Sequence, residues 1–126
     1  MEQEELTGKI IGAAIRVHRE LGPGFLESVY EEALCIELAA SGLGFARQVA
    51  AEVRYQGKKV GEHRLDLLIE DSVVVELKAV LELQDIYFAI VRSYLRATGK
   101  SVGLLLNFAA PTLQTKRIGP DLPVRL

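Results

Sequence analysis

Hydrophobic residues recur at two different spacings along the chain, and each spacing predicts one kind of element. From Thr7 to Leu21 apolar side chains return every three or four residues, which predicts a helix with one buried face. A second helix of this kind is expected from Phe25 to Ala40, after a Gly-Pro-Gly break. A third helix is expected from Asp85 to Thr98, with Gly99 as its stop. This last helix is apolar on most of its surface, so it should be well buried.

Strand patterns fill most of the remaining chain. One strand is expected from Phe45 to Tyr55, and another begins at Lys59 after a turn. The second strand runs into a hairpin over His63–Lys78, HRLDLLIEDSVVVELK, in which apolar and polar residues alternate. The run Ser101–Asn107 is almost wholly apolar, which is typical of a central strand covered on both faces. Thr112–Ile118 is expected to add an edge strand.

The order of these elements predicts an α/β fold, in the order α-α-β-β-β-α-β with the edge strand after it. A hairpin that leads into a helical crossover and returns as a strand gives a mixed central sheet with helices on both faces. A chain of 126 residues is long enough to bury a substantial core and too short for two domains of ordinary size. We therefore expect a single domain over residues 1–126.

The hairpin carries the main candidate for chemistry. A three-residue loop from Glu70 to Ser72 places Asp66 directly opposite Glu76, with their Cβ atoms about 4.5–5.5 Å apart. Two carboxylates at this distance repel each other unless a cation offsets the repulsion, and Mg²⁺ or Mn²⁺ prefers such oxygen ligands. Lys78 follows on the same face, where its ammonium group can hold a water molecule or a phosphate oxygen.

The same alternation has a plainer interpretation. A half-exposed hairpin also alternates charged with apolar residues, and Glu76 and Lys78 would then be solvated charges. Two features favour a covered site instead: Leu68 and Val74 share the charged face, and helices precede and follow the hairpin. Carboxylates on a covered sheet need partners.

Candidate site residues outside the hairpin also have structural alternatives. Glu27 lines up with the apolar stripe of the second helix, although an acidic residue in a first helical turn is also favoured by the helix dipole. His18 lies within the apolar stripe of the first helix, as a hydrogen-bonded core residue or a group at the edge of the pocket. Arg92 and Arg96 form a basic ridge that either contacts phosphates or is a solvated helix face.

Composition narrows the class of protein. Hydrophobic residues make up 49% of the chain and charged residues 25%, which is typical of a globular protein rather than a disordered one. The net charge of −2 gives no electrostatic argument by itself for nucleic acid or an anionic membrane. The sequence shows neither a signal peptide nor a membrane span, and the single cysteine, Cys35, is expected to be a buried thiol. We expect a cytoplasmic protein.

Several stretches together resemble the GxxExxY family: VHRELGPGFLESVYEEAL, then Arg64 and Asp66, then VVVELKAV, and later SYLRATG followed by VGLLLNF. The letters of the family name correspond to Gly24, Glu27 and Tyr30. The resemblance extends from about Leu6 to Ile118. That family is assigned by similarity to the PD-(D/E)xK superfamily, whose fold is restriction-endonuclease-like.

The resemblance implies a metal-dependent nuclease that hydrolyses phosphodiester bonds of DNA. Asp66, Glu76 and Glu27 would hold Mg²⁺ or Mn²⁺, with the backbone carbonyl of Leu77 as a further ligand. Lys78 would orient the attacking water or neutralise developing charge. A nuclease that cuts both strands generally needs two sites, so a homodimer is a further expectation. The candidate substrate contacts are His18, Gln48, Arg64, Arg92 and Arg96.

One stretch departs from the family pattern. Related members usually carry a polar His-Glu-Ala-Gln stretch on the helix after ExK, and here the corresponding residues are Tyr87, Phe88, Ala89 and Ile90. A glutamine at the last position commonly faces the site in related nucleases, and Ile90 cannot form hydrogen bonds. The alternative function is therefore a catalytically inactive member of the fold that binds nucleic acid or a protein partner.

Overall fold

The structure, a computed structural model, describes residues 1–120. The prolines of the C-terminal tail, GPDLPVRL, predict a segment that is loose or used in packing, and this tail lies outside the described residues from position 121 onward. In chain order the elements are α1 (Gln3–Leu21), α2 (Glu27–Ala40), β1 (Phe45–Tyr55), β2 (Lys58–Ile69), β3 (Val73–Lys78), α3 (Asp85–Thr98), β4 (Val102–Asn107) and β5 (Gln114–Ile118).

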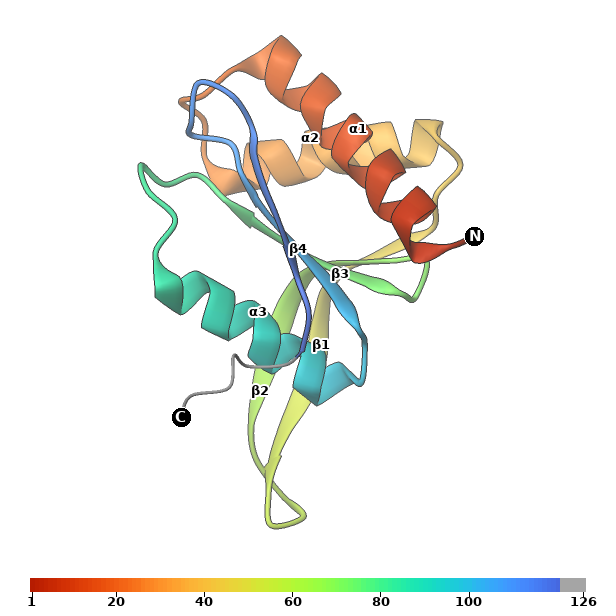
Figure 1. The fold of residues 1–126 in the computed structure, drawn as a ribbon, viewed down its shortest axis with the longest axis vertical. Coiled ribbons are helices and arrows are strands. Elements are labelled where there is room, and N and C mark those ends of the chain that lie inside the picture. Colours follow the sequence, from red (N-terminus) through yellow and green to blue (C-terminus); the bar gives the residue numbers. More distant parts are fainter. Residues whose placement is uncertain (121–126) are drawn as a thin grey trace.

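The five strands form one sheet in the order β1-β2-β3-β4-β5. β3 and β4 are parallel and the other neighbours are antiparallel, because α3 is the crossover between β3 and β4. The predicted mixed sheet is confirmed, and the expected edge strand is present as β5. β1 and β2 extend well beyond the other strands and form an arm at one end of the molecule (Figure 1).

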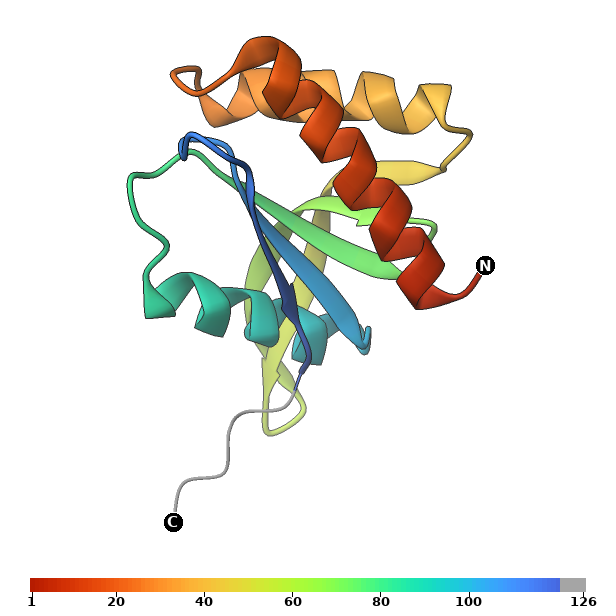
Figure 2. The same ribbon diagram turned by 45° about the horizontal axis from the view of Figure 1, so that its top comes forward.

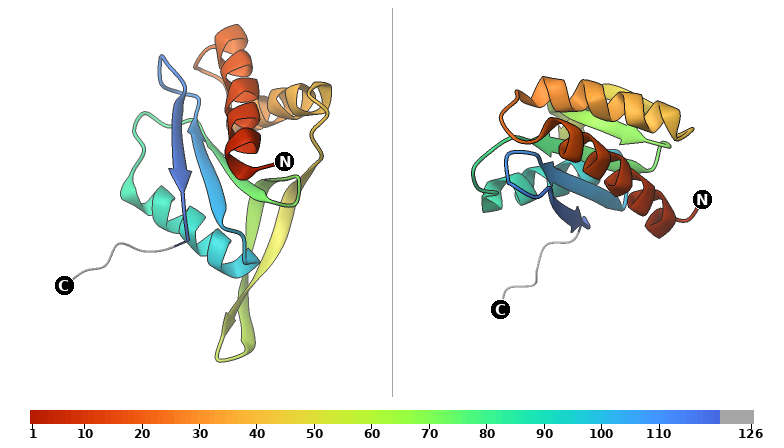
Figure 3. Two further views of the ribbon diagram at one scale, coloured as in Figure 1. Left: turned by 45° about the vertical axis from the view of Figure 1, so that its right-hand side comes forward. Right: turned by 90° about the horizontal axis from the view of Figure 1, so that it is seen from above.

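Three layers are visible when the molecule is turned (Figures 2 and 3). α1 and α2 cover one face of the sheet, and their apolar stripes meet residues such as Leu67, Val75 and Leu104 in the larger core cluster. α3 covers the opposite face, where Val91 and Leu95 pack in the second cluster. The central strands β3 and β4 are buried along almost their whole length, as the continuous apolar run of β4 predicted.

α3 has the predicted bounds, whereas the first two helices begin at different residues from those predicted. α1 begins at Gln3 instead of Thr7, because Leu6 continues the apolar stripe and is only 2% exposed. α2 begins at Glu27 instead of Phe25. The hydroxyl of Tyr30 accepts a hydrogen bond from the Phe25 backbone N–H and donates one to a carbonyl of the preceding loop, so this side chain fixes the loop outside the helix.

The sheet turns at the position of Asp66. Alternation predicted one common face for Leu65, Leu67 and Ile69, but Leu65 packs under α3, whereas Leu67 and Ile69 pack under α1 and α2. Opposite Asp66 on β1 lies Gln48, whose backbone is left-handed with φ of 51°. A left-handed residue within a strand redirects the side chains that follow, and the strong right-handed twist of a two-stranded arm adds to the change of face.

Candidate active site

The β2–β3 hairpin has the predicted loop and register. Three residues, Glu70–Ser72, join the strands, and the paired residues are Leu67 with Val75, Leu68 with Val74, and Ile69 with Val73. The next pair in this register would be Asp66 with Glu76, but the ladder ends at Leu67. β2 bends away into the arm at this point while β3 continues along the sheet (Figure 1). The two carboxyl groups therefore stand at an opening between two sheet strands.

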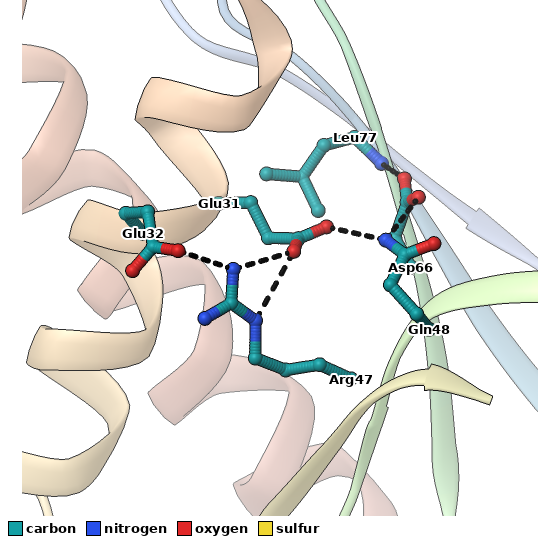
Figure 4. Close-up of polar contacts among 6 residues, drawn as sticks. All are labelled: Glu31, Glu32, Arg47, Gln48, Asp66 and Leu77. Atoms are coloured by element: carbon teal, nitrogen blue, oxygen red, sulfur yellow. Dashed lines mark hydrogen bonds and ion pairs between the residues drawn. The ribbon is translucent and has the colours of Figure 1, made fainter.

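Hydrogen bonds of the Asp66 side chain connect β2 to β3 and β1 at this opening. Its Oδ2 accepts the backbone N–H of Leu77 at 2.9 Å, and its Oδ1 accepts the side-chain amide of Gln48 at 3.4 Å (Figure 4). The carboxylate thus satisfies a β3 amide that β2 does not reach with its own backbone. Asp66 is fixed from β1 and β3 as well as from its own strand.

Glu76 is buried beside Asp66, with 7% of its surface exposed. Burial, together with the negative charge of Asp66, raises the pKa of this carboxyl to about 8, although Lys78 acts in the opposite direction. Its Oε1 is buried and has no hydrogen-bond partner within residues 1–120. The protonated form therefore predominates at pH 7 when no cation is present.

The ammonium group of Lys78 lies between a carboxyl group and an aromatic ring. Nζ is 3.5 Å from Oε2 of Glu76 and 4.9 Å from the centroid of the Tyr87 ring on α3. Tyr94 lies about two turns further along the crossover helix, and its burial, together with the charges of Glu76 and Asp66, raises its pKa to about 12. The site thus combines two carboxyl groups and one ammonium group with two tyrosine rings.

A third acidic group, that of Glu31, reaches the site from α2 (Figure 4). Its Oε1 accepts a hydrogen bond from Gln48 at 3.0 Å, so Gln48 connects it to Asp66. Arg47 donates to Oε2 of Glu31 at 3.1 and 2.8 Å and to Glu32 at 2.7 Å. The hydrogen bond from Arg47 lowers the pKa of the Glu32 carboxyl, and the two glutamates raise the pKa of Arg47.

The structure does not bring Glu27 to Asp66 and Glu76. Glu27 is the first residue of α2, is exposed, and forms no hydrogen bond or ion pair within residues 1–120. Over the same residues no cluster of three or more His, Cys, Asp and Glu side chains is arranged to hold a metal ion. Glu31 follows Glu27 by four residues, one helical turn nearer the buried part of α2, which explains why the two share a face and differ in depth.

The candidate substrate contacts lie in different environments. His18 is buried, with its Nε2 2.8 Å from the carbonyl oxygen of Ala110, so it has the geometry of a core histidine. Arg64 is exposed on β2 and donates to the backbone carbonyl of Gln48 at 2.9 Å. Arg92 is half-buried, and its Nε lacks a hydrogen-bond partner in the described part of the chain, whereas Arg96 is exposed. The two arginines of the predicted basic ridge therefore differ in exposure.

Comparison with known proteins gives two matches at the level of family and fold. The family described as the PD-(D/E)XK nuclease superfamily matches residues 4–118. The chain belongs to this superfamily. A crystal structure of the protein SSO0001 has the same fold with a TM-score of 0.60 and 18% sequence identity, covering 76% of this chain. The present chain spans 50% of the length of that one. A search of curated proteins found no match.

The residues of the candidate site fit a divalent cation. Asp66 and Glu76 supply two hard oxygen donors, and Mg²⁺ is often held by one or two carboxylates together with water and substrate phosphate. The buried, unpartnered Oε1 of Glu76 is the structural observation that calls for a positive partner. Asp66 and Glu76 would hold the cation, with the Leu77 carbonyl as the further ligand that the superfamily resemblance implies.

Several residues of the candidate site were not predicted from the sequence, namely Glu31, Arg47, Tyr87 and Tyr94. The spacing of Glu31 from the buried residues Leu34 and Leu38 already placed it on the apolar stripe of α2. No comparable signal identified Arg47, because its contact with Glu31 depends on how β1 crosses α2. In residues 1–120 no helix is long and apolar enough to span a membrane.

Proposed function

We propose that this protein is a magnesium-dependent nuclease that hydrolyses phosphodiester bonds of DNA. The observation that carries the proposal is the grouping of Asp66, buried Glu76 and Lys78 at the opening between β2 and β3. Membership of the PD-(D/E)XK nuclease superfamily supports a nuclease-like activity for such a site. When bound, the cation would polarise the phosphodiester and lower the pKa of the attacking water.

The protein's own side chains would position the reactants and stabilise charge. Asp66 is held rigidly by the Leu77 amide and by Gln48, so its oxygens have a fixed direction. The ammonium group of Lys78 lies next to Glu76 and can orient the water or neutralise negative charge that develops on the phosphate. Glu31 would act through Gln48, as a positioning residue for Asp66.

The proposed setting is the cytoplasm, a reducing compartment in which the buried thiol of Cys35 stays free. The proposed functional unit is a homodimer, because cutting both strands of a duplex requires two sites.

The activity is tested by incubating the protein with supercoiled plasmid and with linear DNA in Mg²⁺ or Mn²⁺. We expect cutting by the natural protein, and loss of at least about a hundredfold in rate in Lys78→Met and Asp66→Asn. Lys9→Met, which removes an exposed lysine from α1, is the matched control and should cut normally. Equal cutting by Lys78→Met and the control would refute the assigned site.

A second candidate is a catalytically inactive member of the fold that binds nucleic acid or a protein partner. The observation that favours it is the apolar character of α3 at the site: the Tyr87 ring faces Lys78, and Ile90 packs in the second core cluster where related nucleases carry a glutamine. Under this candidate Mn²⁺ raises the melting temperature through binding, as it does for a nuclease, while DNA and RNA both remain uncut. Ile90→Gln then serves as a gain-of-function test.

A further inference from the structure

A cleft of about 530 Å³ lies between the β1–β2 arm and the C-terminal half of α3, outside the carboxylate site. We call it the arm cleft. Its polar lining consists of Glu52 and Arg54 from β1, His63 from β2, and Ser93 and Arg96 from α3. Figure 1 shows the crossover helix lying across the two long strands where they leave the rest of the sheet. Three elements therefore contribute polar groups to one concave surface.

The hydrogen bonds inside the arm cleft fix the role of its histidine. Ser93 Oγ lies 2.7 Å from the carbonyl of Ile90 and 3.0 Å from Nε2 of His63. A carbonyl can only accept, so the hydroxyl donates its one proton to Ile90, and Nε2 of His63 must donate to Ser93. Ser93 is therefore not activated as a nucleophile. His63 is instead held as a hydrogen-bonded imidazole, with the Tyr94 ring edge-on at 4.7 Å between centroids.

The charges in the arm cleft favour an anion. Arg54 is paired with Glu52 at 2.6 Å and donates to the carbonyl of Gly57, so these two side chains nearly cancel each other. Arg96 is exposed and forms no hydrogen bond or ion pair within residues 1–120. One uncompensated guanidinium group therefore faces the cleft beside an imidazole, and a guanidinium binds phosphate oxygens in bidentate geometry.

The arm cleft is adjacent to the carboxylate site on the same side of the sheet. His63 precedes Asp66 by three residues on β2, which is about 10 Å along a strand. Tyr94 contacts His63 and also lies close enough to Glu76 and Asp66 to feel their charge. A strand of DNA advances about 3.4 Å per phosphate along its axis. A strand with one phosphodiester at the carboxylates can therefore present a nearby phosphate of the same strand to the arm cleft.

We propose that the arm cleft binds a backbone phosphate of the DNA strand that enters the carboxylate site, with Arg96 as its ligand. This assignment rests on the proposed nuclease function and adds a binding contact that belongs to neither the metal ligands nor Lys78. A phosphate contact positions the strand and carries no base preference. Arg96 is thus assigned to substrate affinity and not to the chemical step.

The test measures binding separately from cutting. Fluorescein-labelled 12-nucleotide single-stranded DNA is titrated with protein in EDTA, where cutting is prevented, at several salt concentrations. Arg96→Gln should weaken binding about fivefold or more and reduce the salt slope by about one phosphate contact. The control is Arg19→Gln, which removes an exposed arginine from α1 on the opposite face of the sheet and should change neither quantity.

Each outcome separates this assignment from the nuclease proposal. If Arg96→Gln and Arg19→Gln have the same affinity for DNA, Arg96 makes no specific phosphate contact. The arm-cleft assignment is then overturned, whether or not the natural protein cuts DNA. If binding depends on Arg96 but Mg²⁺ and Mn²⁺ never produce cutting, the cleft assignment stands and the nuclease proposal fails. If the natural protein binds no DNA, both are overturned. Arg96 is exposed, so its substitution should leave the melting temperature unchanged.

Discussion

Replacing Glu76 by glutamine should change how the stability of this protein depends on pH. The folded-state pKa of Glu76 is about 8, against a reference value of 4.5. Between these two values the folded state keeps a proton that the unfolded state has lost, so the free energy of unfolding falls as the pH rises. The slope is about 1.4 kcal/mol per pH unit, which amounts to about 3 kcal/mol between pH 4.5 and 7. The contribution of Glu76 to the free energy of unfolding is fully present below pH 4.5 and is lost as the pH rises through 8.

The measurement is urea unfolding in EDTA at intervals from pH 5 to pH 8, for the natural protein and for Glu76→Gln. The glutamine carries no titrating proton, so the difference between the two free energies should change by about 3–4 kcal/mol over this range in favour of the variant. Glu62→Gln is the matched control, since Glu62 is also paired with a lysine, at 3.2 Å from Lys59, but is exposed. Parallel pH profiles for the natural protein and Glu76→Gln would refute the reasoning about burial.

Three further outcomes are expected. Mn²⁺ binding at pH 7 should release about one proton from Glu76. Calorimetry in buffers of different ionisation enthalpy measures this release, and a binding enthalpy that is the same in all buffers would contradict it. Gly103→Ala should destabilise the fold by about 1–3 kcal/mol, because the added Cβ would lie 2.6 Å from a methyl carbon of Val91. Gly8→Ala, with no atom within 4 Å of the added Cβ, is its control in the same urea titration and should be neutral or stabilising. Tyr30→Phe should lower the free energy of unfolding by about 1–3 kcal/mol through loss of two buried hydrogen bonds, and an unchanged urea midpoint would contradict that role.

The pairing of β2 with β3 shows what could be predicted from the local sequence pattern. Alternation and the three-residue loop were enough to predict the register that brings Asp66 and Glu76 to the end of the β2–β3 ladder and Lys78 beside Glu76, because a hairpin's register depends on its loop length and on which side chains are apolar. The end of the β2–β3 ladder at Asp66 could not be predicted from alternation and loop length. It depends on the left-handed residue Gln48 on the neighbouring strand and on the twist of the arm.

The sequence by itself determined the α/β class and the mixed sheet, because both follow from the order of the elements. It also determined the bounds of most elements to within a few residues and the hairpin that carries two carboxyl groups, because these follow from the spacing of residues within one segment. Only the tertiary structure decided which carboxylate of α2 connects to Asp66, because Glu27 and Glu31 share one helix face and only the crossing of β1 selects Glu31. It also decided the burial that raises the pKa of Glu76 and the meeting of His63 with Ser93. Such contacts join segments far apart in the chain, and no local spacing encodes them.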